Sequence, residues 1–277
     1  MDIFKCSQYV ISMVFNRRTL YIITALFLTN VLFGQAVDSS RIVRVLTYNI
    51  LHGKTLKGDF DLDLIASVIS GAKPDLVALQ EVDYKTNRSK KYDLVTELGF
   101  RTQMSPLFSR AMYYDDGEYG EGILSNYTFL TTKNHPLPYT EGKEPRSAAE
   151  VNVVIASGDT IRFVGTHLDH EADDYNRFIQ AKELDRVVRR DDLPTILVGD
   201  LNETPENRGM QLLFKYWERS FADNAFTFPS DEPIKKIDYV LYHPARRWRV
   251  LEKRVIDERV ASDHRPVLVV LELLPGN

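Results

Sequence analysis

Short runs rich in Val, Ile and Leu recur along most of the chain and constrain its fold more than any other feature. Several of them alternate apolar and polar residues or are β-branched, which is typical of half-buried β-strands. We therefore expect strands at residues 41–50, 74–83, 148–156, 160–169, 194–202, 235–243 and 265–273.

Helical patterns separate some of these runs. Residues 61–72 begin with acidic residues and reach Gly71, and residues 172–190 end in basic residues, as helices commonly do. In the second segment Phe178, Leu184 and Val188 have helical spacing. Strands with interspersed helices predict a layered α/β or α+β domain.

Polar side chains stand at the ends of several predicted strands. Any one of them has a structural explanation, such as ending a strand or capping a turn. Six such positions, with eight polar residues, are harder to explain in that way in one chain, and we take them as a candidate site. The residues are Asn49, Glu81, His167, Asp200 with Asn202, Asp238, and Asp263 with His264.

This set of side chains suits phosphoryl transfer to water. A hard cation such as Mg²⁺, or alternatively Mn²⁺, takes oxygen ligands of the kind that Glu81, Asp263 and the amide of Asn49 offer. Asp200 can orient and deprotonate a water molecule. The remaining residues can stabilise the charge that develops on the phosphoryl oxygens: Asn202, His167 and a protonated His264 as donors, with Asp238 orienting His264.

Six motifs in order resemble the endonuclease/exonuclease/phosphatase superfamily, which includes deoxyribonuclease I. They are "TYNI", "ALQEVD", "GTHLD", "GDLN", "IDYV" and "SDHRPV", and the resemblance covers about residues 41–273. It implies an α+β fold, a four-layer α/β/β/α sandwich with two packed mixed β-sheets. It also implies metal binding by Asn49 and Glu81 with Asp263 nearby, phosphate binding by His167, nucleophile positioning by Asp200 and Asn202, and acid/base duty for Asp238 with His264.

The stretch "TYNILHGK" further resembles an exported bacterial subgroup of this superfamily. In the same comparison "DYKTNRS" supplies Arg88 and "EPRSAAEV" supplies Arg146. Arg146 is a candidate phosphate clamp, with a surface ion pair as the alternative, and His52 is a candidate substrate contact or a structural residue. The stretch "GEGILSNYTF" departs from the subgroup at Asn126 and Thr128.

The first 36 residues predict a secretory signal. Arg17 and Arg18 precede an apolar run over residues 19–33, which is short for a membrane span, and small residues follow at Gly34 and Ala36. We expect cleavage after Ala36, export to the periplasm or the medium, and one domain over residues 37–277. Residues 1–12 are a gene-model extension if Met13 is the start, and an uncleaved membrane anchor is the alternative.

The net charge and the composition limit the classes of ligand and partner that the chain is expected to bind. The formal net charge of −4 does not suit a protein that is held on nucleic acid by bulk charge, and we expect a monomer that binds a phosphate ester. Residues 112–122 are tyrosine-rich and acidic, and they are either a solvated hairpin tip or a surface for a choline-like cation. The sequence thus predicts an exported phosphoesterase, with a secreted deoxyribonuclease-like nuclease and a non-catalytic ligand-binding protein as alternatives.

Overall fold

A computed structural model describes residues 38–223 and 225–276. Twelve strands form two six-stranded sheets in this part of the chain. The first sheet has the order β11-β12-β1-β2-β4-β3. Its strands are β11 (Trp248–Val255), β12 (Val267–Leu273), β1 (Ile42–Asn49), β2 (Leu76–Tyr84), β4 (Gly117–Ser125) and β3 (Ser105–Tyr114).

The second sheet has the order β5-β6-β7-β8-β10-β9. Each sheet contains one parallel pair, β1 with β2 and β7 with β8, among antiparallel neighbours, so both sheets are mixed. The strands are β5 (Phe129–Leu137), β6 (Arg146–Val154), β7 (Thr160–His167), β8 (Thr195–Asp200), β10 (Asp238–His243) and β9 (Glu218–Arg219).

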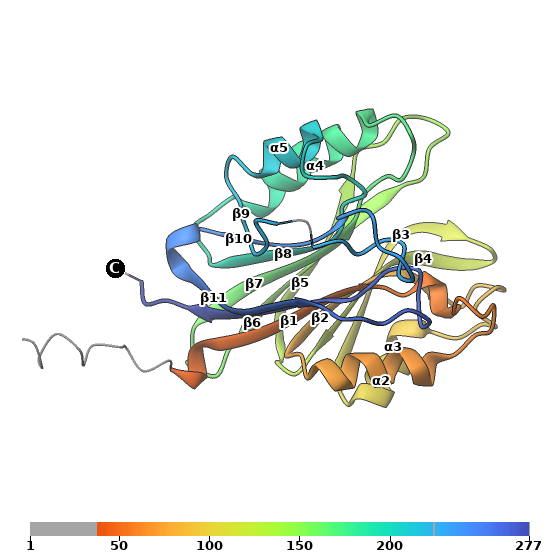
Figure 1. Ribbon diagram of the computed structural model, residues 1–277, viewed down its shortest axis with the longest axis horizontal. Coiled ribbons are helices and arrows are strands. Elements are labelled where there is room, and N and C mark those ends of the chain that lie inside the picture. The colour runs from red at the N-terminus through yellow and green to blue at the C-terminus, as the bar shows by residue number, and fades with distance from the viewer. Residues whose placement is uncertain (1–37, 224, 277) are drawn as a thin grey trace, which may run out of the picture. The chain divides into compact units, whose positions relative to one another are not determined.

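The two sheets pack face to face, and helices cover their outer faces (Figure 1). Val45, Phe163 and Val198 belong to the apolar layer between the sheets. Helices α2 (Leu62–Ala72) and α3 (Leu94–Thr102) lie against the first sheet, and α4 (Tyr175–Val188) and α5 (Arg208–Leu213) against the second. The expected four-layer α/β/β/α sandwich is confirmed.

The helix ends follow ordinary capping chemistry. Asp61 accepts a hydrogen bond from the backbone N–H of Leu64 at 2.9 Å and so begins α2, as the acidic start of residues 61–72 predicts. Asp93 caps α3 in the same way. Three short 3₁₀ helices complete the described elements: η1 (Ser39–Arg41), η2 (Leu51–Gly53) and η3 (Ala245–Arg247).

Helix α4 packs one face against the second sheet, and Phe178 is not part of that face. Ala181, Leu184 and Val188 face the second sheet, whereas Phe178 is only partly buried and its ring lies under the guanidinium of Arg208. Residues six apart on a helix point in different directions, so Phe178 cannot share a face with Leu184.

No helix in the described ranges is long and apolar enough to cross a membrane. The predicted signal, residues 1–36, lies outside the described residues. Its cleavage and the domain boundary therefore stay predictions.

Candidate active site

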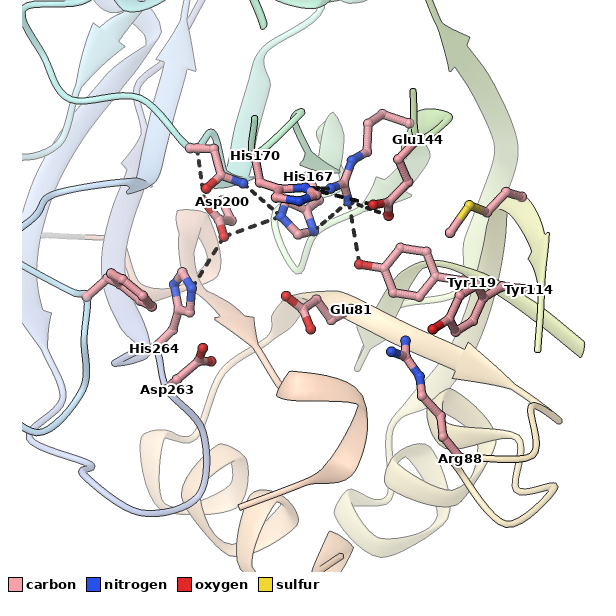
Figure 2. A pocket seen from close by; sticks show the side chains of 14 residues that line it. Glu81, Arg88, Tyr114, Tyr119, Glu144, His167, His170, Asp200, Asp263 and His264 are labelled. Atoms are coloured by element: carbon pink, nitrogen blue, oxygen red, sulfur yellow. Dashed lines mark hydrogen bonds and ion pairs between the residues drawn. The ribbon is translucent and has the colours of Figure 1, made fainter. Parts of the chain in front are cut away.

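A cavity of about 380 Å³ opens at the edge where the carboxyl ends of the parallel strands of both sheets meet (Figure 2). Seven of the ten residues predicted for the site line it, and the other three, Asn49, His52 and Asp238, contact lining residues from behind. The predicted residues in the lining are Glu81, Arg146, His167, Asp200, Asn202, Asp263 and His264.

Glu81 reaches the cavity because β2 is irregular at this point. The pairing of β2 with β4 shifts between Leu79 and Val82, and Glu81 has a φ of 57°. In a regular strand Glu81 would share the face of Leu79, which packs under the helices. The bulge instead turns its carboxylate toward the other sheet, as bulges beside functional sites often do.

Strand register brings three further residues side by side in the second sheet. His167 on β7 is the partner of Asp200 on β8, and Asp200 is the partner of Asp238 on β10. Gly199 makes the close approach possible, because a Cβ at this position would lie 1.9 Å from the carbonyl oxygen of Thr166. The glycine in "VGD" is therefore required by the backbone next to Asp200.

The carboxylate of Asp200 lies at the centre of the polar contacts. Its Oδ2 accepts a hydrogen bond from Asn49 Nδ2 at 3.2 Å and lies 3.4 Å from His167 Nε2 and 3.5 Å from His264 Nε2. Its Oδ1 accepts from the backbone N–H of Asn202 at 3.0 Å. Burial raises the pKa of Asp200, which suits a group that has to accept a proton near neutral pH.

His264 is held between two carboxylates. Its Nδ1 donates to Asp238 Oδ2 at 2.9 Å, and the ring of Phe228 packs against the imidazole with centroids 4.8 Å apart. Burial disfavours the charged imidazole, but Asp238 and Asp200 outweigh it and raise the pKa of His264. His264 is therefore a cationic donor at the cavity wall.

Arg146 comes from the first position of β6 and is 2% exposed. Its guanidinium lies 3.1 Å from His167 Nδ1, 3.0 Å from His170 Nδ1 and 3.4 Å from a carboxylate oxygen of Glu144. Burial and the neighbouring Arg146 keep the pKa of His167 well below its usual range, so this imidazole is neutral. A surface ion pair, the alternative reading of Arg146, does not describe this buried position.

Residues 46–264 match the Endonuclease/Exonuclease/phosphatase family. The chain belongs to this family. Solved structures with the same fold include family members from Beutenbergia cavernae and Bacteroides vulgatus. The first is 21% identical with a TM-score of 0.69, covering 84% of this chain and 72% of that one. The second is 20% identical with a TM-score of 0.69, covering 84% of this chain and 99% of that one.

A third similar structure is a mannosyl-6-phosphatase of Bacteroides thetaiotaomicron. It is 17% identical with a TM-score of 0.68, covering 83% of this chain and 99% of that one. Members of this family are hydrolases that act on phosphate esters, and most of the residues that line the cavity at the sheet edges are polar or charged.

Family membership implies a divalent metal, and the donor set on the cavity floor fits one. The carboxylates of Glu81 and Asp263 both line the cavity and supply hard oxygen donors (Figure 2). Burial opposes ionisation of Glu81, but hydrogen bonds from His52 and Asn49 lower its pKa to about 2. Glu81 is therefore available as a carboxylate across the physiological pH range.

Asn49 and His52 occupy supporting positions in this family member. Asn49 accepts from the backbone N–H of Leu51 through its amide oxygen, and its Nδ2 donates to both Glu81 and Asp200. His52 Nδ1 lies 3.4 Å from Glu81 Oε2. Both residues orient Glu81 in this geometry, while their direct contact with metal or substrate stays a prediction.

Asp200, Asp238 and His264 form a second group whose ligand atoms all lie within 4.8 Å of one another. A protonated imidazole has no lone pair for a metal, and His264 already joins the two carboxylates. The three residues therefore fit a proton-handling group better than a metal centre.

Seven residues in the lining were not predicted for the site. Arg88 and the stretch 112–122, which holds Met112, Tyr114 and Tyr119, were noted in the sequence without a place in the site, and Glu144, His170 and Phe228 were not noted. His170 follows His167 by three residues in "THLDH", and Glu144 stands two residues before Arg146 in "EPR", so proximity in the sequence to predicted residues was the available signal. Asn126, a departure from the subgroup pattern, donates to the carbonyl of Pro74 and does not line the cavity.

Proposed function

We propose that this chain is an exported, Mg²⁺-dependent phosphoesterase that hydrolyses its substrate by direct attack of water. The observation that carries the proposal is the environment of Asp200, a buried carboxylate at the cavity wall between a neutral His167 and a cationic His264. Such a carboxylate can accept a proton from water and has donors on both sides for the phosphoryl oxygens.

The residues divide the reaction between them. Asp200 orients the water and takes its proton, and the side-chain amide of Asn202, 2.9 Å from His167 Nε2, holds that imidazole near the phosphate. Arg146 and His264 supply positive charge to the phosphoryl oxygens as they become more negative. Glu81 and Asp263 would hold the Mg²⁺, which when bound polarises the phosphate and stabilises the leaving oxygen.

A secreted nuclease is the alternative within catalysis. The negative formal charge of the chain and the acidic turn at Asp115 and Asp116 favour a small substrate over a long polyanion. The similar mannosyl-6-phosphatase supports including phosphomonoesters in any screen. A non-catalytic ligand-binding role is disfavoured because Asp200, Asn202, Asp238 and His264 are all present and in contact.

The test is turnover of the full chain on a phosphomonoester, a phosphodiester, a phospholipid and DNA, with Mg²⁺ or with EDTA. We expect Mg²⁺-dependent hydrolysis of at least one small ester, and Asp200→Asn, which keeps the shape but cannot accept the proton, should lower turnover by about 10²–10⁴-fold. Asp223→Asn, outside the cavity lining, is the matched control. Full activity in folded Asp200→Asn would refute the mechanism, and DNA as the best substrate would favour the nuclease.

A further inference from the structure

One end of the cavity is not used by the chemistry described above. Arg88, Tyr114, Tyr119 and Glu144 line it, on the far side of Glu81 from Asp263 and His264 (Figure 2). We call these four residues the distal pocket. They come from the turn after β2, the β3–β4 hairpin and the segment before β6.

Arg88 is fixed in place as a hydrogen-bond donor. Its Nε and Nη2 donate to Asp83 at 2.7 and 2.9 Å, and the carboxylate of Asp83 is fully buried. The guanidinium lies 4.6 Å from the ring centroid of Tyr114 and 5.5 Å from that of Tyr119. Its Nη1 has no protein acceptor among the described residues, so it can donate to a ligand.

The opposite wall offers an acceptor. The carboxylate of Glu144 is 27% exposed, and it lies 3.4 Å from the guanidinium of Arg146. Tyr114 is 40% exposed, although the guanidinium of Arg88 lies 4.6 Å from its ring centroid. Each charged group here already has a partner of opposite sign, Asp83 for Arg88 and Arg146 for Glu144. The distal pocket is thus polar and nearly neutral overall.

These features exclude several ligand classes. A choline-like cation would meet the guanidinium of Arg88 beside the rings of Tyr114 and Tyr119, and the like charges disfavour it there. A second phosphate would meet the carboxylate of Glu144, with only a compensated Arg88 to attract it. An apolar chain would desolvate both charged groups without replacing their hydrogen bonds.

A polyhydroxyl ring satisfies all of the groups at once. Its hydroxyls can accept from Arg88 Nη1 and donate to Glu144, and its C–H groups can contact the part of the Tyr114 ring that Arg88 leaves exposed. We propose that the distal pocket recognises the sugar ring of a hexose phosphate, so that the ring is seated there while the phosphate lies at Asp200. The proposal rests on the proposed function, because it places the phosphate at the catalytic end of the cavity.

The experiment measures binding apart from turnover. In the full-length Asp200→Asn variant with Mg²⁺, calorimetry compares glucose 6-phosphate with glycerol 3-phosphate, phosphocholine and adenosine monophosphate. We expect glucose 6-phosphate to bind at least about tenfold more tightly than the other three, which corresponds to roughly 1.4 kcal/mol. Equal binding of glycerol 3-phosphate, or tighter binding of phosphocholine or the nucleotide, would overturn the assignment.

Further substitutions in the Asp200→Asn variant test whether the preference for glucose 6-phosphate arises in the distal pocket. Tyr114→Ala and Glu144→Gln should each reduce the preference for glucose 6-phosphate over glycerol 3-phosphate by several-fold. Two variants are used so that the test can still be made if one of them does not fold. Tyr113→Ala is the matched control, because Tyr113 is the neighbouring residue, 74% exposed and outside the cavity lining. A preference unchanged in both distal-pocket variants would also overturn the assignment.

Turnover by the unsubstituted chain separates the two proposals. Hydrolysis of p-nitrophenyl phosphate without any selectivity for the hexose ester would retain the proposed function and remove the distal-pocket assignment. Selective binding of glucose 6-phosphate without hydrolysis of any ester would retain the pocket assignment and remove the proposed function.

Discussion

His264 Nδ1 lies 2.9 Å from Asp238 Oδ2, with both side chains buried at the edge of the second sheet. We expect Asp238→Asn to leave the imidazole in place but to remove the charge that favours its protonated form. Turnover should then fall by about 10²–10⁴-fold, close to the loss in His264→Ala. The double variant should be little worse than either single one, because residues that act as one unit are not additive.

Turnover per folded molecule is the measurement for this pair, with thermal unfolding to determine the folded fraction. His243→Ala, a histidine outside the cavity lining, is the control. Near-normal turnover in folded His264→Ala would make the contact structural, and fully additive losses would mean that the two residues act separately.

Glu81 is predicted to be the principal metal ligand. Glu81→Gln keeps the size of the side chain and removes its charge, so Mg²⁺ binding should weaken by at least about tenfold and Mg²⁺-stimulated turnover should fall by orders of magnitude. Calorimetry with Mg²⁺ and with Mn²⁺ measures the first effect without reference to activity. Glu118→Gln, on the β3–β4 hairpin and outside the cavity lining, should bind the metal normally. Unchanged affinity in Glu81→Gln would remove Glu81 from the metal site.

The central strands and the catalytic residues could be predicted from the sequence because they leave strong local signals. A buried strand is a run of β-branched residues, and a polar residue directly after it is conspicuous, as Asp200 is after "ILVG". The expected strands did not include β3, β4, β5, β9 and β11. Only the turn between β3 and β4 was indicated, by the hairpin tip considered for residues 112–122. In β5 eight of nine residues are at least partly exposed, all except Leu137, and the strand lacks an apolar pattern.

The glycines of β4 suggest a turn in the sequence, although they lie within a strand in the structure. Gly120 reads as a turn residue, yet its missing Cβ would lie 2.1 Å from the carbonyl oxygen of Ser109, so a glycine is needed for β3 and β4 to approach. The distal pocket could not be predicted from the sequence either. Arg88, Tyr114 and Glu144 come from three separate segments, and only the tertiary structure brings them to the same end of the cavity.

Export is a prediction from the apolar run before Gly34. If residues 1–36 are a cleaved signal, the mature protein should begin near Val37 and should be recovered outside the cytoplasm. N-terminal sequencing of fractionated protein is the measurement. Intact Met1 or Met13 in a soluble cytoplasmic fraction would defeat the prediction, and an intact N-terminus in the membrane fraction would favour the uncleaved anchor.

The environment of Glu150 allows us to predict how the stability of the fold depends on pH. It lies on β6 with its side chain 1% exposed, and it accepts hydrogen bonds from Arg190 at 2.7 and 2.8 Å, with His135 Nε2 at 2.9 Å. Burial favours the protonated form, but these contacts and Arg162 outweigh it and lower the pKa of Glu150 from 4.5 to about 2. The folded state therefore favours the carboxylate.

The lowered pKa of Glu150 determines the direction in which the free energy of unfolding changes with pH. Glu150 stabilises the fold fully above its unfolded pKa of 4.5, and this contribution is lost as the pH falls toward about 2. Glu150→Gln should lower the free energy of unfolding at pH 7 by roughly 2–3 kcal/mol, with a difference from the unsubstituted chain that shrinks as the pH falls.

Urea unfolding at pH 7, 4.5 and 3 measures this difference in the free energy of unfolding. Glu252→Gln, whose side chain is 46% exposed, should behave like the unsubstituted chain. A stability deficit in Glu150→Gln that stays constant from pH 7 to 3 would show that the charge of Glu150 does not stabilise the fold.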